Sequence, residues 1–427
     1  MSAVLDNRKK ADRRGGDRRT QRQNVAIDNR KSGERRKNDR RSARAKQNKI
    51  EPVAIIGIGR DTSLMHMLEP IQPYLENKFE GKVITDVAVN FPGSVFYEDD
   101  KGWHEDRVSG ITEEWVQRLA VASARYAKQD SSEKSPIMSA ELPRGERIQI
   151  VRSPAVEVGR SSLTIRVPDF RIRSMEGYVE QKMFNRVLWS NPFKPKQTPT
   201  ELREFLKKDD QILVELLEQG DFPGFLKAAV KFHKNIAVIG GTGSGKTTLM
   251  KTLCEFISPF ERILTVEDVR ELFKGSTFRN TVHMLYSKGK QGVADVMPAD
   301  LLAAANRMKP DRVLLTELRG SEAFDVLKLL TSGNKGLITS YHADNPQLGF
   351  ERFSLMAGEH PDARAYSKSD LKRVIESTMD IILHITADLV FGDDGMPIGK
   401  DRYGTELYYD PIKKMQLSHG DGGVVHV

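Results

Sequence analysis

The sequence has almost no cysteine. Cys254 is the only one among 427 residues, so the chain has no second thiol with which to form an intramolecular disulfide. This scarcity is typical of proteins that fold in a reducing compartment. We interpret Cys254 as a small buried hydrophobic residue and not as a catalytic thiol.

Long apolar runs are also missing. No run approaches the roughly 20 residues of a membrane span, and the basic N-terminal segment lacks the apolar core of a signal peptide. These absences predict a cytoplasmic protein whose contact with a membrane would have to be peripheral.

Positive charge is abundant, but only in one place. The formal net charge is +8, yet residues 1–50 hold 18 of the 67 Lys and Arg residues and only 6 of the 59 Asp and Glu residues. The other 377 residues therefore carry 49 basic and 53 acidic side chains. Positive charge therefore indicates an acidic partner only for the first 50 residues, and not for the rest of the chain.

The basic segment contains an internal repeat. Residues 6–19 are echoed by residues 28–41, at an offset of 22 residues. Few apolar residues lie in either copy, so we predict residues 1–50 to be a disordered arm. Paired arginines present forked donors that suit phosphate groups. The sequence leaves open whether the arm binds anionic lipid, nucleic acid or an acidic partner, or is merely solvated.

Two further regions have the composition of folded domains, as expected for a chain of this length. Residues 51–185 predict an α+β domain, with one amphipathic helix over 113–126 and strands at the apolar runs 53–58, 83–89, 148–151 and 163–167. Residues 186–200 are polar and rich in proline, which predicts a linker. Near its end, Thr198, Pro199 and Glu201 form a helix-start signal.

Residues 201–427 predict an α/β domain. Short apolar runs alternate with helical stretches, which is the pattern of a parallel sheet. The runs that we expect to form its strands are 236–239, 263–266, 313–315 and 337–338.

A phosphate-binding loop follows the first of these strands. The segment Gly240-Gly-Thr-Gly-Ser-Gly-Lys-Thr247 lies between an apolar strand and a helix-compatible stretch, which is the required context of a P-loop. Its backbone N–H groups and the helix N-terminus favour phosphate. We expect Lys246 to reach the β- and γ-phosphates of ATP and Thr247 to bind Mg²⁺. The predicted nucleotide-binding residues are Gly241, Thr242, Gly243, Ser244, Gly245, Lys246, Thr247 and Thr248.

Acidic residues and a histidine end the neighbouring strands. Glu271 follows the strand at 263–266, Glu317 follows the strand at 313–315, and His342 follows the strand at 337–338. Parallel strands bring their carboxyl ends to one edge of the sheet, where the P-loop also lies. A carboxylate there is suited to hold the hydration shell of Mg²⁺ or to accept a proton from an attacking water.

Four boxes in this order give the chain a family resemblance. They are the P-loop, the acidic segment 265–272, the strand and glutamate of 308–320, and the histidine segment 339–345. Together they resemble the hexameric traffic ATPases of type IV secretion and conjugation systems, within the secretion-ATPase superfamily. Residues 283–292 favour the type IV secretion branch over the pilus branch. The resemblance covers residues 145–410 well, 51–145 loosely and 1–50 not at all.

The resemblance implies an α+β N-terminal domain, a linker and a RecA-like P-loop motor domain, assembled as a homo-hexamer at inner-membrane secretion machinery. It also implies roles. Glu271 matches the catalytic base, Glu317 the glutamate near Mg²⁺, and His342 the residue that senses the γ-phosphate. Arginines of the N-terminal domain are expected to compensate phosphate charge, with Arg166 and Arg147 favoured over Arg152 and Arg171.

The leading hypothesis is therefore an Mg²⁺-dependent ATPase that energises type IV secretion or conjugative transfer, through pilus assembly or substrate translocation. One alternative is a nucleic-acid-binding protein that grips DNA through the arm and uses ATP as a conformational ligand. A second alternative is a pilus-retraction motor.

Overall fold

The computed structural model describes residues 62–419, apart from 77–78, 81, 130–131, 133, 169–171, 191–202, 269, 273–279 and 287–295. The predicted disordered arm, the strand expected at 53–58 and the helix-start signal at 198–201 lie outside the described residues. Within the described ranges, the helices are all too short or too polar to cross a membrane.

The first half of the described chain forms a six-stranded sheet in which every pairing is antiparallel. Its strand order is β3-β2-β1-β6-β5-β4. The strands are β1 (Asp86–Val89), β2 (Ser94–Asp99), β3 (Gly102–Arg107), β4 (Ile137–Glu141), β5 (Arg147–Val151) and β6 (Ser162–Arg166).

Helix α4 (Glu113–Tyr126) has the bounds that the periodicity predicts. Thr112 caps it by accepting a hydrogen bond from the Trp115 amide, and its most buried face runs through Val116 and Leu119. With α2 (Thr62–Met67) and α3 (Gln72–Leu75) it covers the sheet and encloses one apolar core. This part of the chain is the α+β fold that the sequence predicts.

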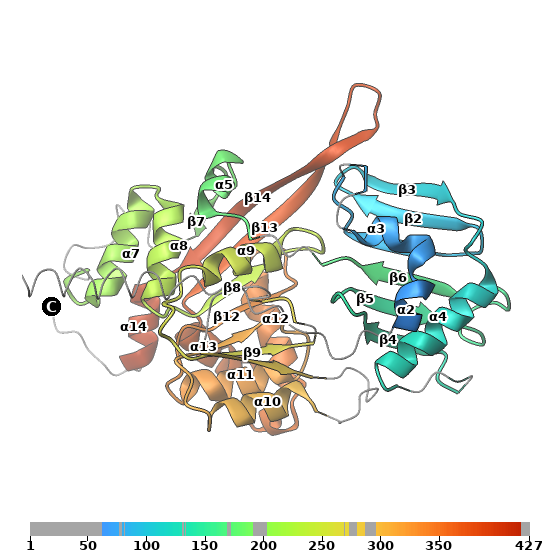
Figure 1. Ribbon diagram of the computed structural model, residues 1–427. Coiled ribbons are helices and arrows are strands. Elements are labelled where there is room, and N and C mark those ends of the chain that lie inside the picture. The colour runs from blue at the N-terminus through green and yellow to red at the C-terminus, as the bar shows by residue number, and fades with distance from the viewer. Residues whose placement is uncertain are drawn as a thin grey trace, which may run out of the picture. The chain divides into compact units, whose positions relative to one another are not determined.

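The strands that follow β6 in the chain form an eight-stranded sheet of order β10-β9-β11-β12-β8-β13-β14-β7 (Figure 1). The strands are β7 (Leu188–Ser190), β8 (Ile236–Ile239), β9 (Ile263–Glu267), β10 (Thr281–Leu285), β11 (Arg312–Leu315), β12 (Ile338–Tyr341), β13 (Ile381–Phe391) and β14 (Pro397–Tyr409). All pairings are parallel except β13 with β14. The four predicted strands are neighbours in this sheet, which confirms the RecA-like α/β fold class.

Helices cover both faces of this sheet. In β8, Ile236 and Val238 belong to one apolar core and Ala237 and Ile239 to another, because successive side chains of a strand point to opposite faces. The first core includes α5 (Met175–Glu180), α7 (Lys208–Glu218), α8 (Phe222–Lys231) and α9 (Lys246–Cys254). The second includes α10 (Pro298–Ala305), α11 (Glu322–Thr331), α12 (Pro346–Gly358) and α13 (Lys368–Thr378). Cys254 is 1% exposed in the first core, as its interpretation as a buried residue requires.

The segment before the predicted linker packs with the eight-stranded sheet. Met175, Tyr178 and Phe184 lie in the same core as β8, and β7 pairs with β14. Met175, Tyr178 and Phe184 precede the linker expected at 186–200, and β7 overlaps it. The core of the eight-stranded sheet therefore includes residues on the N-terminal side of that expected linker.

Candidate active site

The P-loop joins the end of β8 to the start of α9. Gly240 approaches β13 so closely that a Cβ atom at this position would lie 2.0 Å from the Ile385 carbonyl oxygen. Gly243 and Gly245 have φ angles of +75° and +95°, in the left-handed region that favours glycine. Glycine at these positions is therefore a requirement of the backbone path.

Several donors of the loop converge on one oxygen. The Gly241 carbonyl accepts from the Lys246 ammonium at 2.7 Å, from the Ser244 hydroxyl at 2.9 Å and from the Ser244 amide at 3.4 Å. The Lys246 ammonium also donates to the Gly240 carbonyl at 2.9 Å. Ammonium, hydroxyl and amide donors gathered at a helix N-terminus suit a phosphate group.

Lys246 is buried, with 9% of its surface exposed. Burial, opposed in part by the Glu317 carboxylate and reinforced by the positive charge of Arg166, lowers the pKa of its ammonium to about 8. An added negative charge would compensate for the lost solvation and raise this pKa. Lys246 therefore lies in a place that favours an anion.

Glu317 and His342 lie at the edge of the sheet that holds the P-loop. The His342 Nε2 atom is 3.3 Å from a Glu317 carboxylate oxygen. Burial raises the pKa of the Glu317 carboxyl, and Asp268 and Glu271 raise it further, whereas Lys246 opposes the shift. Burial and the nearby Lys246 lower the pKa of the His342 imidazole. The lowered pKa favours the neutral form of this imidazole.

The acidic segment after β9 is built around Glu267. This side chain is fully buried, and its carboxylate accepts from the Thr265 hydroxyl at 2.7 Å and from the amides of Glu271 and Leu272 at 2.9 and 2.8 Å. Two of these bonds fix the backbone on which Glu271 sits. Glu267 thus determines where the Glu271 carboxylate lies.

Arg147 and Arg166 come from neighbouring strands of the six-stranded sheet. Arg147 on β5 forms ion pairs with Asp268 at 2.7 Å and with Glu271 at 2.6 Å. Arg166 on β6 pairs with Asp86 at 3.2 Å and acts electrostatically on Lys246. The structure therefore brings both favoured arginines to the predicted site residues.

The other two candidate arginines differ from these. Arg152 donates to Gln117 at 3.0 Å and to the Ser132 carbonyl at 3.5 Å, both within the N-terminal part of the chain. These contacts give it a structural role. Arg171 lies outside the described residues.

Sequence reasoning missed two arginines at the site. Arg319 pairs with Asp268 at 3.3 Å and also with Glu317. Its position two residues after Glu317 was a usable signal. Arg402 on β14 donates from Nε to the Gly243 carbonyl at 3.2 Å. No motif marks Arg402, because only the pairing of β14 with β13 brings it to the P-loop.

Comparison with known proteins identifies a family and several relatives of this chain. The family described as Type II/IV secretion system protein matches residues 201–391. The type IV secretion system protein VirB11 of Brucella suis is 40% identical over 363 residues, which cover 84% of this chain and 94% of that protein. The type IV secretion system protein PtlH of Bordetella pertussis is 38% identical over 76% of this chain and 90% of its own length.

One solved structure is similar to this chain in sequence. The chain is 39% identical to the VirB11 ATPase of the Brucella suis type IV secretion system, crystallised in complex with sulphate. The match covers 82% of this chain and 99% of that one, with a TM-score of 0.43. The level of sequence identity, and the share of each chain that it covers, assign this chain to a family: it belongs to the VirB11 family of type IV secretion system ATPases.

Proposed function

We propose that this protein hydrolyses ATP in a Mg²⁺-dependent reaction and uses the energy for type IV secretion or conjugative transfer. The observation that carries the proposal is the convergence of Lys246, Glu317 and His342 at one sheet edge, with Glu271 fixed beside them by Glu267 and Arg147. The relatives at about 40% identity are type IV secretion proteins, which favours secretion over pilus retraction.

The residues fit a nucleotide phosphate and Mg²⁺. In the described ranges, no three His, Cys, Asp or Glu side chains gather closely enough to hold a metal ion by themselves. Mg²⁺ in nucleotide sites is bound by one or two protein groups together with phosphates and water, so the Thr247 hydroxyl and the Glu317 carboxylate are a sufficient protein contribution. When bound, Mg²⁺ would neutralise developing negative charge on the phosphates.

The chain's own groups supply the other roles. Lys246 positions the β- and γ-phosphates, together with the donors of residues 241–248. Glu271 accepts the proton of the attacking water, and its ion pair with Arg147 at 2.6 Å holds its carboxylate in place. His342 offers a hydrogen-bonding imidazole beside Glu317, and its lowered pKa favours the uncharged form.

Arg147 and Arg166 would offset the charge that spreads over the phosphate oxygens in the transition state. In this proposal Arg147 has two states, one paired with Glu271 and one turned toward the phosphate. An arginine that exchanges partners in this way would connect the chemistry to the six-stranded sheet.

Assembly and location complete the proposal. We propose a homo-hexamer, located in the cytoplasm at the periphery of the inner membrane and working with membrane components of the secretion machine. The domain division proposed is an arm at 1–50, an N-terminal domain at 51–185, a linker at 186–200 and a motor at 201–427. Family resemblance supports the ring, and the mass of the assembled particle in solution would test it.

The arm has a separate proposed function. We propose that residues 1–50 bind phosphate groups, on anionic lipid or on nucleic acid. The support is their excess of 12 positive charges, which the rest of the chain does not share. A nucleic-acid-binding protein that uses ATP only as a conformational ligand remains the second candidate function.

The decisive experiment measures phosphate release by the purified protein. We expect Lys246→Ala and Glu271→Gln each to lower kcat at least about 100-fold, the scale of losing proton transfer or one main charge at the site. Lys208→Ala and Glu215→Gln, two exposed positions on α7, are the matched controls. Wild-type turnover in both site variants would refute the proposed hydrolysis.

A further inference from the structure

The hairpin of β13 and β14 contacts the P-loop at two points. Ile385 on β13 places its carbonyl oxygen against Gly240, at the start of the loop. Arg402 on β14 donates from Nε to the carbonyl of Gly243, in the middle of the loop. The Arg402 Cδ atom also lies 3.7 Å from the position that a Cβ atom on Gly245 would take.

The contact at Gly243 constrains a peptide unit of the loop. The peptide bond is planar and trans, so its carbonyl oxygen and its N–H group point in opposite directions. A Gly243 carbonyl held toward Arg402 therefore directs the Ser244 N–H away from Arg402. That N–H lies 3.4 Å from the Gly241 carbonyl oxygen, where the donors of the loop converge.

Gly243 has a left-handed φ of +75°, so this constraint acts on a residue whose backbone is otherwise free to adopt many conformations. Glycine has more backbone conformations to lose than any other residue. A hydrogen bond from a charged side chain to this peptide selects one of those conformations. Without it, ordering the loop around a phosphate would cost more conformational entropy.

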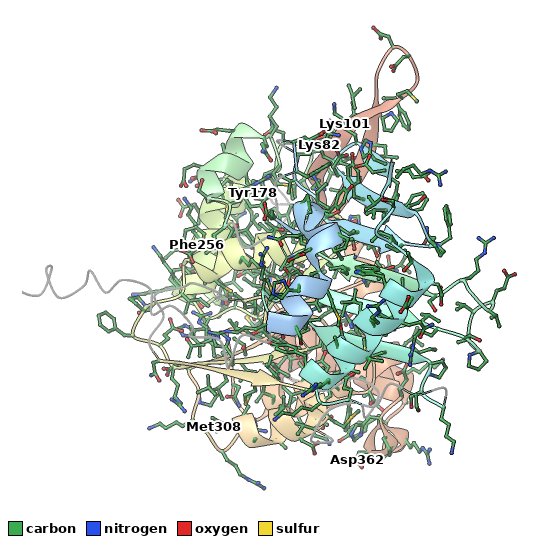
Figure 2. The ribbon with its side chains drawn as sticks, turned by 45° about the vertical axis from the view of Figure 1, so that its right-hand side comes forward. Lys82, Lys101, Tyr178, Phe256, Met308 and Asp362 are labelled. Atoms are coloured by element: carbon green, nitrogen blue, oxygen red, sulfur yellow. The ribbon has the colours of Figure 1, made fainter. Side chains whose placement is uncertain are left out.

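Arg402 also adds positive charge to the loop. Burial lowers the pKa of its guanidinium, and the like charge of Arg173 lowers it further, while Asp100 and Glu98 act in the opposite direction. The guanidinium of Arg173 in turn lies 5.3 Å from the ring centre of Tyr178, which is labelled in Figure 2. An anion bound near these two like charges would reduce their mutual repulsion.

We propose that Arg402 is a positioning residue of the nucleotide site: through the Gly243 carbonyl it holds the P-loop in the shape that binds phosphate. This inference rests on the proposed role of the P-loop as the nucleotide site. Arg402 acts through the loop, so its removal should weaken nucleotide binding more than it slows the chemical step.

The test compares Arg402→Ala, Arg402→Lys and a control, Arg373→Ala, which removes an exposed arginine from α13. For Arg402→Ala we expect the KM for ATP and the Kd for a fluorescent ADP analogue to rise about tenfold, the usual effect of losing a hydrogen bond from a charged group. We expect kcat to change less than about threefold, because the loop would hold the phosphates equally well in the ground state and in the transition state. Arg402→Lys should recover part of the affinity, and Arg373→Ala should match the wild type.

Hydrogen exchange of the loop amides supplies a second readout. The amides of residues 241–247 should exchange faster in Arg402→Ala, with the melting temperature nearly unchanged. A Kd within about twofold of the wild type in both Arg402 variants would overturn the proposal, as would an equal loss of kcat and thermal stability without any change in Kd. If the wild type fails to hydrolyse ATP, the proposed function fails, but the ADP affinities still decide the role of Arg402.

Discussion

At the scale of single residues, the site depends on side chains that act by positioning other residues. Glu267 is the clearest case, because its buried carboxylate holds the amides of Glu271 and Leu272. The family resemblance identifies Glu271, yet nothing in the sequence separates Glu267 from a solvated acid at a strand end. Its role follows from burial, which depends on strand order and not on local pattern.

His384 on β13 provides a prediction at this scale. The side chain is 8% exposed, and its Nδ1 atom lies 2.5 Å from the Thr405 hydroxyl. Burial lowers the pKa of this imidazole, opposed by the charges of Asp344 and Glu406 and reinforced by Lys246. The unfolded chain takes up the proton near pH 6.5, whereas the folded chain does so only at lower pH.

The sign of the pH effect follows from linkage. Below about pH 6.5 the unfolded state binds more protons than the folded state, so the free energy of unfolding decreases as the pH falls. We expect the melting temperature to drop between pH 7.5 and pH 5.5, and to drop less in His384→Gln. Equal pH dependence of melting in the two proteins would contradict the prediction.

At the scale of elements, the two sheets differ in how well the sequence predicts them. The strands of the eight-stranded sheet that lie nearest the P-loop are short apolar runs, because helices bury both of their faces. In contrast, β3 alternates between half-buried and exposed residues along its whole length, and its Gly-Trp-His-Glu-Asp-Arg sequence gives no apolar run. The sequence therefore predicts β8, β9, β11 and β12, and misses β7, β10, β13 and β14 of the same sheet as well as β2, β3 and β4 of the other.

The same contrast applies to the site. The P-loop, Glu317 and His342 lie within or just after predicted strands, so strand order alone brings them together. Arg402 lies on β14, which pairs with β13 along 11 residue positions, but its polar sequence hides that pairing. Long-range contacts of this kind have no local signature.

Arg312, at the start of β11, links this strand to the end of α8, and we predict the effect of removing it on stability. It is 1% exposed and donates to the Val230 carbonyl at the end of α8 at 2.6 Å, and to Glu261 at 2.5 Å. We expect Arg312→Met to lower the free energy of unfolding by about 3 kcal/mol, because it leaves Glu261 without its buried partner.

The control for this prediction is Arg307→Met, a change at an exposed position two residues after α10, which should stay within about 0.5 kcal/mol of the wild type. Urea unfolding of the three proteins measures the difference. A loss below about 1 kcal/mol in Arg312→Met would show that the ion pair only offsets its own desolvation.

At the scale of the whole molecule, charge separates the arm from the rest. The excess of 12 positive charges in residues 1–50 contrasts with 49 basic and 53 acidic residues elsewhere. Near an anionic lipid surface each basic residue contributes about 1 kcal/mol to binding. This composition supports the proposal that residues 1–50 attach the protein to an anionic surface.

The arm is tested in the full chain. We expect the protein to sediment with vesicles of mixed phosphatidylglycerol and phosphatidylcholine, and less so as salt increases. Deletion of residues 1–50, or replacement of the paired arginines by glutamine, should abolish sedimentation. Binding to double-stranded DNA with no binding to vesicles would instead support the nucleic-acid alternative. The paired arginines are Arg13, Arg14, Arg18, Arg19, Arg35, Arg36, Arg40 and Arg41.

The position of β8 has a mechanical consequence. Its four residues pair in parallel register with four residues of β12 on one side and four of β13 on the other (Figure 1). A pull along β8 would load both ladders in shear, with all their hydrogen bonds sharing the force, whereas peeling would break them one at a time. A displacement of the β13–β14 hairpin along the strands would therefore act on β8, and on the P-loop at its end, through the whole β8–β13 ladder at once.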